Sequence, residues 1–359
     1  MHGFSYSFPA IRGTLANQEY YVVMCPLKLL SKIFTFDEAP LPPEFRAQRT
    51  LNKARIPEIK HYILNNRSSF AFSAITASVD ATVEFIPIGE NPMDSLVGTL
   101  VVPMSARFII NDGQHRRAAI DTALEEDPSL SEETISVVFF IDRGLKRSQQ
   151  LFADLNKHAV RPNKSLGILY DNRDPLANLA KDLAEKCPPF AGFTDLERTT
   201  LPNRSPKIFT LSGIYHASMA LLEKKRSEIV SENEAKLCME YWSELSKFIP
   251  EWKMIPKKEM SALALRQSFI HVHSVALHAL GIMGNTLIKE FPKTWKGKIS
   301  LLSDIDWSRS SNSIWEGRAM QGGQMSKARQ NVTLTASFLK QKLGLPLSEE
   351  ETRLESNLY

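Results

Sequence analysis

The apolar positions in the first 141 residues fall in short runs, several of which alternate with polar positions, as in strands with one buried face. Strands are therefore predicted at residues 4–8, 20–24, 70–79, 82–88, 96–102, 108–110 and 134–141. Helical spacing predicts helices over 27–34, from Pro57 through Ile63, and from 114 to 124. The last strand is the most apolar run and is predicted to be central and covered on both faces. Strand, helix and strand in sequence predict a parallel crossover, with the turn after residue 111 at its mouth.

From residue 174 onward the apolar spacing becomes helical. Helices are predicted over 176–183, 208–222, 234–248, 260–280 and 326–343, the last with Ser326 as its N-cap. The polar residues 349–359 are predicted to fray. The predicted fold class is α/β (α+β), with a mixed-sheet domain over residues 1–170 and a helical domain over 171–290. Residues 291–359 are predicted to form a C-terminal basic and aromatic segment that packs on the body.

Composition excludes a few classes of protein. The 359 residues carry a net charge of +4, which permits a nucleic-acid partner through a local basic patch. Three widely spaced cysteines favour a reducing cytoplasm over a disulfide framework or a zinc site. No apolar run approaches the ~20 residues that span a membrane, and the N-terminus lacks the pattern of a signal peptide. We therefore expect a cytoplasmic protein with no membrane association.

The most informative stretch joins the strand at 108–110, which Asn111 ends, to the helix after it. Six residues form this turn: Asp112, Gly113, Gln114, His115, Arg116 and Arg117. A helix N-terminus favours acidic residues, yet here the acidic residues lie at the far end, at 125–127. An anion at the turn would explain this order, because backbone N–H groups, the helix dipole and two guanidinium groups would converge on one phosphate. The alternative is that the arginines are solvated surface charges and that Asp112 is only an N-cap.

These six residues, placed after an apolar strand, resemble the signature of the DGQHR-domain proteins, which are similar in fold to ParB and sulfiredoxin. Those relatives place a comparable turn on a phosphate. From the N-terminus to about residue 345 the chain resembles the DndB family, regulators of the DNA phosphorothioation (sulfur modification) system. The resemblance implies a ParB/sulfiredoxin-like sheet domain and a DNA-binding repressor of the modification gene cluster. The implied partners are promoter DNA and other phosphorothioation proteins.

Further basic residues are candidates for anion contacts. Asn156 and Lys157 resemble the second conserved box of the DGQHR proteins and would complete a two-sided phosphate pocket with the turn; the alternative is a helix C-capping cluster. The candidate nucleic-acid contacts are Arg49, Asn52, Arg55, Arg161, Lys164, Arg318, Lys327 and Arg329. A solvated basic loop is the alternative for the first three. Trp307 and Trp315, near the last three, either contact nucleic acid or anchor this segment on the body.

The sequence leaves two functions open. The first is a DNA-binding transcriptional regulator, and the second is a nucleotide-binding switch or NTPase that holds an NTP with Mg²⁺ at the turn. No P-loop motif is present, and a protein adaptor is a third, weaker option. The sequence does not decide whether the protein forms a homo-oligomer. No metal site is predicted, since His271, His273 and His278 lack ligand spacing and are expected to pack or to hydrogen-bond.

Overall fold

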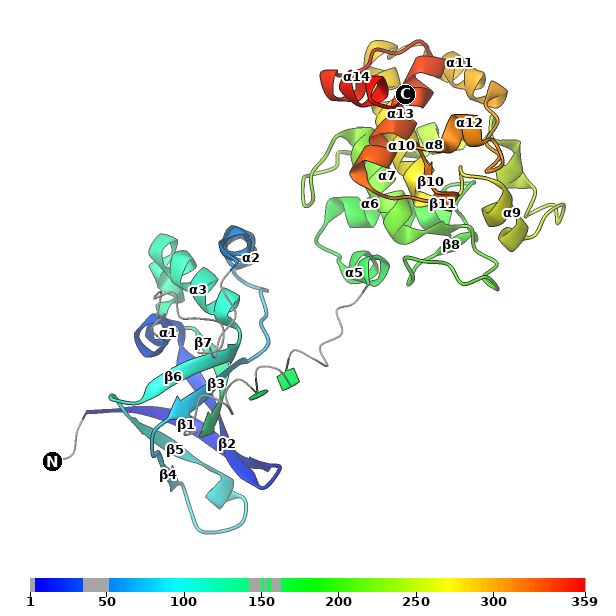
Figure 1. Ribbon diagram of the computed structural model, residues 1–359. Coiled ribbons are helices and arrows are strands. Elements are labelled where there is room, and N and C mark those ends of the chain that lie inside the picture. The colour runs from blue at the N-terminus through cyan, green and yellow to red at the C-terminus, as the bar shows by residue number, and fades with distance from the viewer. Residues whose placement is uncertain (1–3, 35–51, 142–149, 152–153, 156–162, 359) are drawn as a thin grey trace. The chain divides into compact units, whose positions relative to one another are not determined.

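Figure 1 shows the computed structural model, which describes residues 4–34, 52–141, 150–151, 154–155 and 163–358. Contacts divide the chain into two compact units, Met1–Val160 and Arg161–Tyr359. We call them the sheet unit and the helical unit and describe each by itself. In the described part of the chain, no helix combines the length and the apolarity that spanning a bilayer requires.

The sheet unit is built on seven strands in the order β4-β5-β1-β2-β7-β3-β6. Their bounds are β1 Ser5–Leu15, β2 Gln18–Pro26, β3 Ile75–Asp80, β4 Glu84–Pro87, β5 Val97–Pro103, β6 Arg107–Asp112 and β7 Thr134–Ile141. Strand neighbours pair antiparallel, except β3 and β7, which run parallel. Each strand predicted from the apolar pattern is thus present, and the predicted mixed α/β class is confirmed.

Three helices gather on one side of this sheet (Figure 1): α1 Leu27–Ile33, α2 Ile56–Asn65 and α3 Gln114–Glu126. Short 3₁₀ turns, η2 Lys53–Arg55, η3 Asp94–Leu96 and η4 Pro128–Glu132, connect the elements. The core between helices and sheet is aromatic. Phe108 lies 5.9 Å from Phe34 and 5.5 Å from Phe139, measured between ring centroids. The alternation of apolar side chains along the strands places these rings on one face.

The predicted parallel crossover is wrong. β6 is antiparallel to β3, and β3 is parallel to β7, so β6 and β7 run in opposite directions. β6 is an edge strand, and the chain passes through α3 and η4 before it enters β7 on the other side of β3. β7 is central in the sheet, but only Ile135, Val137 and Phe139 are fully buried, and the alternate positions are half-buried. The prediction that both faces are covered is therefore also wrong.

The helical unit contains ten α-helices in its described residues. They are α5 Lys164–Tyr170, α6 Pro175–Lys186, α7 Leu211–Leu222, α8 Glu232–Leu245, α9 Ala262–Ser268, α10 Ser274–Glu290, α11 Trp295–Ile299, α12 Asn312–Trp315, α13 Arg329–Lys342 and α14 Glu349–Ser356. α10 packs between α7 and α13. α7 and α10 approach so closely that a Cβ on Gly281 would lie 2.2 Å from the carbonyl oxygen of Ala217. Glycine is required there for packing.

One apolar core extends from Leu176 to Leu345. It includes Trp307 and Trp315, whose indole N–H groups donate to backbone carbonyls, so both tryptophans anchor the C-terminal segment. The nucleic-acid interpretation of these two side chains is not supported, because they are at most 4% exposed. The predicted division of the chain at residues 170 and 290 stays a prediction.

Three predictions for the helical unit are wrong in detail. The helix expected over 260–280 is two helices, α9 and α10, because Ile270 instead donates its N–H to the carbonyl of Trp307. Residues 349–356, which were predicted to fray, form α14, and a capping box between Ser348 and Glu351 stabilises the start of this helix. Ser326 does not cap α13, which starts at Arg329; its hydroxyl donates to the side chain of Asn331.

Candidate functional site

The turn at residues 112–117 connects β6 to α3 through a glycine in the left-handed region. Gly113 has φ of 108°, and a Cβ there would lie 3.0 Å from Ile75, so other residues would be strained. Gly113 is the N-cap of α3 and offers no side-chain acceptor, and the first turn of α3 contains no acidic residue. The first N–H groups of this helix are therefore left without a side-chain cap, the condition in which helices bind anions.

The two arginines of the turn are paired with carboxylates four positions away, Asp112 at the end of β6 and Asp121 in α3. Arg116 contacts Asp112 at 2.7 Å and also donates to Ser73, at 2.9 Å to its carbonyl oxygen and additionally to its hydroxyl. Arg117 contacts Asp121 at 3.1 Å. The arginine side chains are 14% and 13% exposed, so they are not solvated surface charges. The carboxylates offset much of the positive charge that the sequence led us to expect at this turn.

His115 connects the turn to the predicted basic loop. The backbone N–H of Asn52 donates to Nε2 of His115 at 3.0 Å, which holds η2 against the start of α3. The side chain of Asn52 accepts from the N–H of Ala54 and so caps η2. Lys53 and Arg55 are exposed, and in the described residues neither forms an ion pair with a carboxylate. The structure thus brings two separately predicted segments together.

Several predicted site residues lie outside the described residues: Arg49, Asn156, Lys157 and Arg161. The two-sided pocket between the turn and Asn156 therefore stays a prediction. Gln114, by contrast, is described and is only 6% exposed. The nucleotide alternative also stays a prediction. Among the described residues, no group of three His, Cys, Asp or Glu side chains is arranged to hold a metal ion.

The C-terminal candidates have three different environments. Arg318 is 4% exposed, and its guanidinium group donates to both carboxylate oxygens of Glu355 and to the carbonyl of Leu334. It therefore holds α13 and α14 together, and its buried guanidinium group does not present a surface for DNA. Arg329 is exposed and pairs with Glu350 at 3.1 Å. Lys327 lies beside Lys164 at a cavity of about 460 Å³ in the helical unit.

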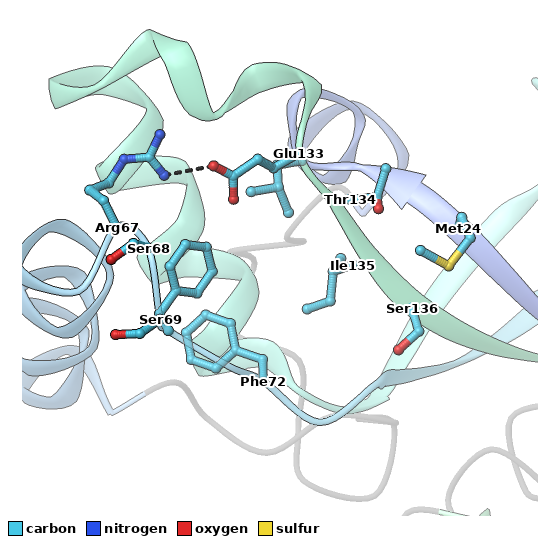
Figure 2. A pocket seen from close by; sticks show the side chains of 11 residues that line it. Met24, Arg67, Ser68, Ser69, Phe72, Glu133, Thr134, Ile135 and Ser136 are labelled. Atoms are coloured by element: carbon cyan, nitrogen blue, oxygen red, sulfur yellow. Dashed lines mark hydrogen bonds and ion pairs between the residues drawn. The ribbon is translucent and has the colours of Figure 1, made fainter. Parts of the chain in front are cut away.

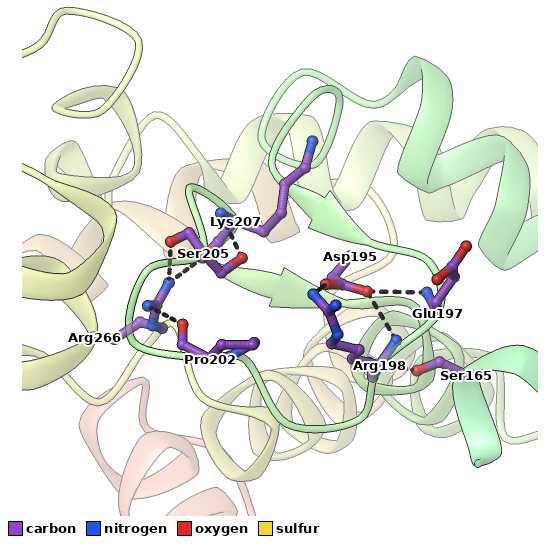
Figure 3. Close-up of polar contacts among 8 residues, drawn as sticks. All are labelled: Ser165, Asp195, Glu197, Arg198, Pro202, Ser205, Lys207 and Arg266. Carbon is purple, nitrogen blue, oxygen red and sulfur yellow. Dashed lines mark hydrogen bonds and ion pairs between the residues drawn. The ribbon is translucent and has the colours of Figure 1, made fainter.

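The basic, proline-rich loop before α7 is held by a residue that sequence reasoning missed (Figure 3). The buried guanidinium group of Arg266 donates to the carbonyls of Pro202, Asn203, Ser205 and Lys207. Lys207 donates to the carbonyl of Gly192 at 2.6 Å, and Arg198 pairs with Asp195 at 3.6 Å. These contacts hold the loop in place within the helical unit. The sequence signal that could have indicated the role of Arg266 is its position on the apolar face of α9.

A hollow of about 400 Å³ in the sheet unit lies beside the start of β7 (Figure 2). Arg67, at its edge, pairs with Glu133 and with Asp127, both at 2.8 Å. Phe70 and Phe72 form an apolar wall. Because the one guanidinium group is matched by two carboxylates, we assign this hollow no ligand.

The histidines of the helical unit pack and hydrogen-bond as predicted. Nδ1 of His271 accepts from the indole N–H of Trp252 at 3.0 Å, and Nε2 of His273 lies 2.9 Å from the carbonyl of Arg266. Burial lowers the pKa of both imidazoles, that of His273 to about 4. His278 instead lines the cavity beside Lys164, a position that the sequence did not indicate.

Comparison with known proteins adds one finding. The model of a family named DndB and described as DNA-sulfur modification-associated matches residues 8–346. No curated protein and no solved structure matches the chain.

Proposed function

The chain belongs to the DndB family of DNA-sulfur modification-associated proteins, and from this premise we propose that it is a DNA-binding transcriptional regulator that represses a DNA phosphorothioation gene cluster. Its partners would be promoter DNA and other proteins of the modification system. We also infer a ParB/sulfiredoxin-like relationship for the sheet unit. The motif at residues 112–117, on a turn from strand to helix, supports that relationship.

One observation carries the proposed DNA contact: the hydrogen bond from Asn52 to His115 holds η2 at the start of α3. Two exposed cations, Lys53 and Arg55, are thereby placed next to a helix N-terminus without a side-chain cap. Cationic side chains and helix N-termini are the groups that most often contact DNA phosphates. We therefore propose that residues 52–55 and the first N–H groups of α3 contact the DNA backbone together.

Within this proposal, Arg116 and Arg117 hold the turn between β6 and α3 in place and do not contact DNA themselves. Arg116 connects Asp112 to Ser73, which precedes β3, and so fixes the direction in which α3 leaves the sheet. Arg117 pairs one helical turn along, with Asp121. Burial raises the pKa of Asp121, and the Arg117 charge opposes that rise. Gly113 supplies the left-handed backbone angle at which β6 turns into α3.

The test is the affinity for a labelled duplex from the promoter of the modification genes, measured by fluorescence anisotropy. Replacing Lys53 and Arg55 by alanine removes two charge-assisted phosphate contacts, which are worth about 1.5–3 kcal/mol each. We expect the double variant to bind at least about tenfold more weakly than the wild type.

The matched control is Lys28→Ala in the same unit. Lys28 is exposed but already pairs with Glu132, so its removal should leave the affinity within about twofold. The proposal fails if the wild-type protein does not bind the duplex, or if the control weakens binding as much as the double variant.

A further inference from the structure

The cavity in the helical unit is formed by segments far apart in the chain. Its lining residues are Asn163, Lys164, Thr199, Thr200, Ser212, Gly213, His216, Ser274, His278 and Lys327. The hydroxyl of Ser165 joins two walls, since it donates to the carbonyl of Arg198 at 2.9 Å and lies 3.1 Å from the hydroxyl of Ser212. Figure 3 shows Ser165 beside Arg198 and, further along the loop, the Arg266 contacts that fix it. The volume of the cavity, about 460 Å³, is within the range of small-molecule sites.

The two charged side chains that line this cavity, Lys164 and Lys327, have the same sign, and none of its ten lining residues is acidic. His216 and His278 also line it, and burial lowers the pKa of both imidazoles. In the described part of the chain, neither lysine forms an ion pair. Burial and the Lys164 charge lower the pKa of Lys327, and burial followed by both lysine charges lowers that of His216. Like charges held together without a counter-charge destabilise the empty cavity, and a bound anion would remove that penalty.

Two long helices begin at the same cavity. α7 and α10 start with Ser212 and Ser274 in their first turns, and neither first turn contains an acidic residue. Thr210 caps the N–H of Gly213 in α7, whereas α10 has no side-chain cap. A Cβ on Gly213 would lie 3.1 Å from the Ser274 hydroxyl, so the glycine lets the two helix starts approach each other. Hydroxyl donors, helix N-termini and cations thus share one concave surface, as in phosphate sites.

We propose that this cavity binds a phosphate group, supplied as free inorganic phosphate or as the monoester of a small metabolite. Lys164 and Lys327 would pair with its oxygens from the rim, while the hydroxyls of Ser212 and Ser274 donate from the helix starts. The cavity is half-open and its walls lie on five segments, and its volume of about 460 Å³ suits a small ligand better than the extended backbone of duplex DNA. The site is in the helical unit and does not rest on the DNA contact proposed for the sheet unit.

The test titrates the full-length protein with inorganic phosphate, adenosine 5′-monophosphate and, as a control without phosphate, adenosine. All five tryptophans lie in the helical unit, so melting followed by tryptophan fluorescence reports on that unit alone. We expect one or both phosphate probes to raise the melting temperature while adenosine does not. A larger shift with the monophosphate would identify a monoester site, and an equal shift would identify free phosphate.

The decisive variant replaces both Lys164 and Lys327 by alanine. Without a ligand it should melt at the wild-type temperature or above it, because repulsion between the lysines is relieved. With a ligand it should bind at least tenfold more weakly by calorimetry. The matched control replaces Lys186 and Lys296, which already pair with Asp182 and Glu240, and should bind like the wild type. The proposal is overturned if the wild-type protein does not bind phosphate, or if the decisive variant binds it as well as the wild type does. It is also overturned if a stoichiometric amount of duplex DNA abolishes phosphate binding.

Discussion

The two basic clusters of this protein differ in what surrounds their cations. At the turn of the sheet unit, Arg116 and Arg117 each contact a carboxylate four positions away in the chain and are largely buried. At the cavity of the helical unit, Lys164 and Lys327 lie side by side, with histidines and hydroxyls as neighbours and no acidic lining residue. The positive charges of the motif at residues 112–117 are therefore better neutralised than those of Lys164 and Lys327. The carboxylate partners, more than the number of basic residues, indicate where an external anion is needed.

The same distinction applies within each unit. Lys53 and Arg55 are exposed next to the neutralised turn, whereas Arg318 and Lys340 are buried in pairs with glutamates of α14. Paired cations hold elements of the fold together, and cations without a described carboxylate partner are the candidates for DNA or phosphate. The predictions below test this division, beginning with the largest expected effect.

The largest effect is expected at the buried pair of Lys340 and Glu351. Their side chains are 7% and 4% exposed, and Nζ of Lys340 lies 2.7 Å from the carboxylate. Replacing Lys340 by alanine leaves a buried, unpaired carboxylate, which should lower the free energy of unfolding of the helical unit by about 3–5 kcal/mol. Denaturant unfolding followed by tryptophan fluorescence measures this loss. The exposed Lys186→Ala should change it by less than about 1 kcal/mol, and a similar small change for Lys340 would show that the pair is not structural.

A loss of stability that is smaller for each group involved is expected when the pH falls from 7 to 5. Burial lowers the pKa of His273 and of His278 to about 4, and the ordinary value is 6.5. The charges of Arg309, Lys327 and His271 also disfavour the charged form of His273, whereas the hydrogen bond to the Arg266 carbonyl favours it. His216 disfavours the charged form of His278.

Below pH 6.5 the unfolded chain therefore binds protons that the folded unit excludes, and stability falls with the pH. The loss at pH 5 should be about 2 kcal/mol for each histidine. The same tryptophan-monitored unfolding at pH 7 and pH 5 measures it. Equal stability at the two pH values would show that these imidazoles are not held neutral. Phosphate, if it binds the cavity, should add to the stability at both pH values.

Much of the sheet unit could be predicted from the sequence, because strand alternation is a local signal. The strands at 20–24 and 134–141 were located within two residues of their bounds. The opposite directions of β6 and β7 could not be predicted, since they depend on the pairing of both strands with β3, which is distant from them in the sequence. The break between α9 and α10 depends likewise on a hydrogen bond to Trp307, far along the chain.

The site was less predictable for the same reason. The pairing of Arg116 and Arg117 follows i, i+4 spacing, so Asp112 and Asp121 were visible in the sequence as partners. The partner of Arg318 is Glu355, 37 positions away, and no local rule indicates it. The phosphate cavity combines five segments, none of which is conspicuous alone.

The central claim is that cations without carboxylate partners make the anion contacts, and the salt dependence of DNA binding tests it most directly. Each phosphate contact contributes about 0.9 to the slope of log affinity against log salt concentration. The Lys53→Ala, Arg55→Ala double variant should therefore reduce the magnitude of this slope by about 2. Arg117→Ala, which removes a cation paired with Asp121, should leave the slope unchanged. A slope that falls for Arg117→Ala and not for the double variant would contradict the account.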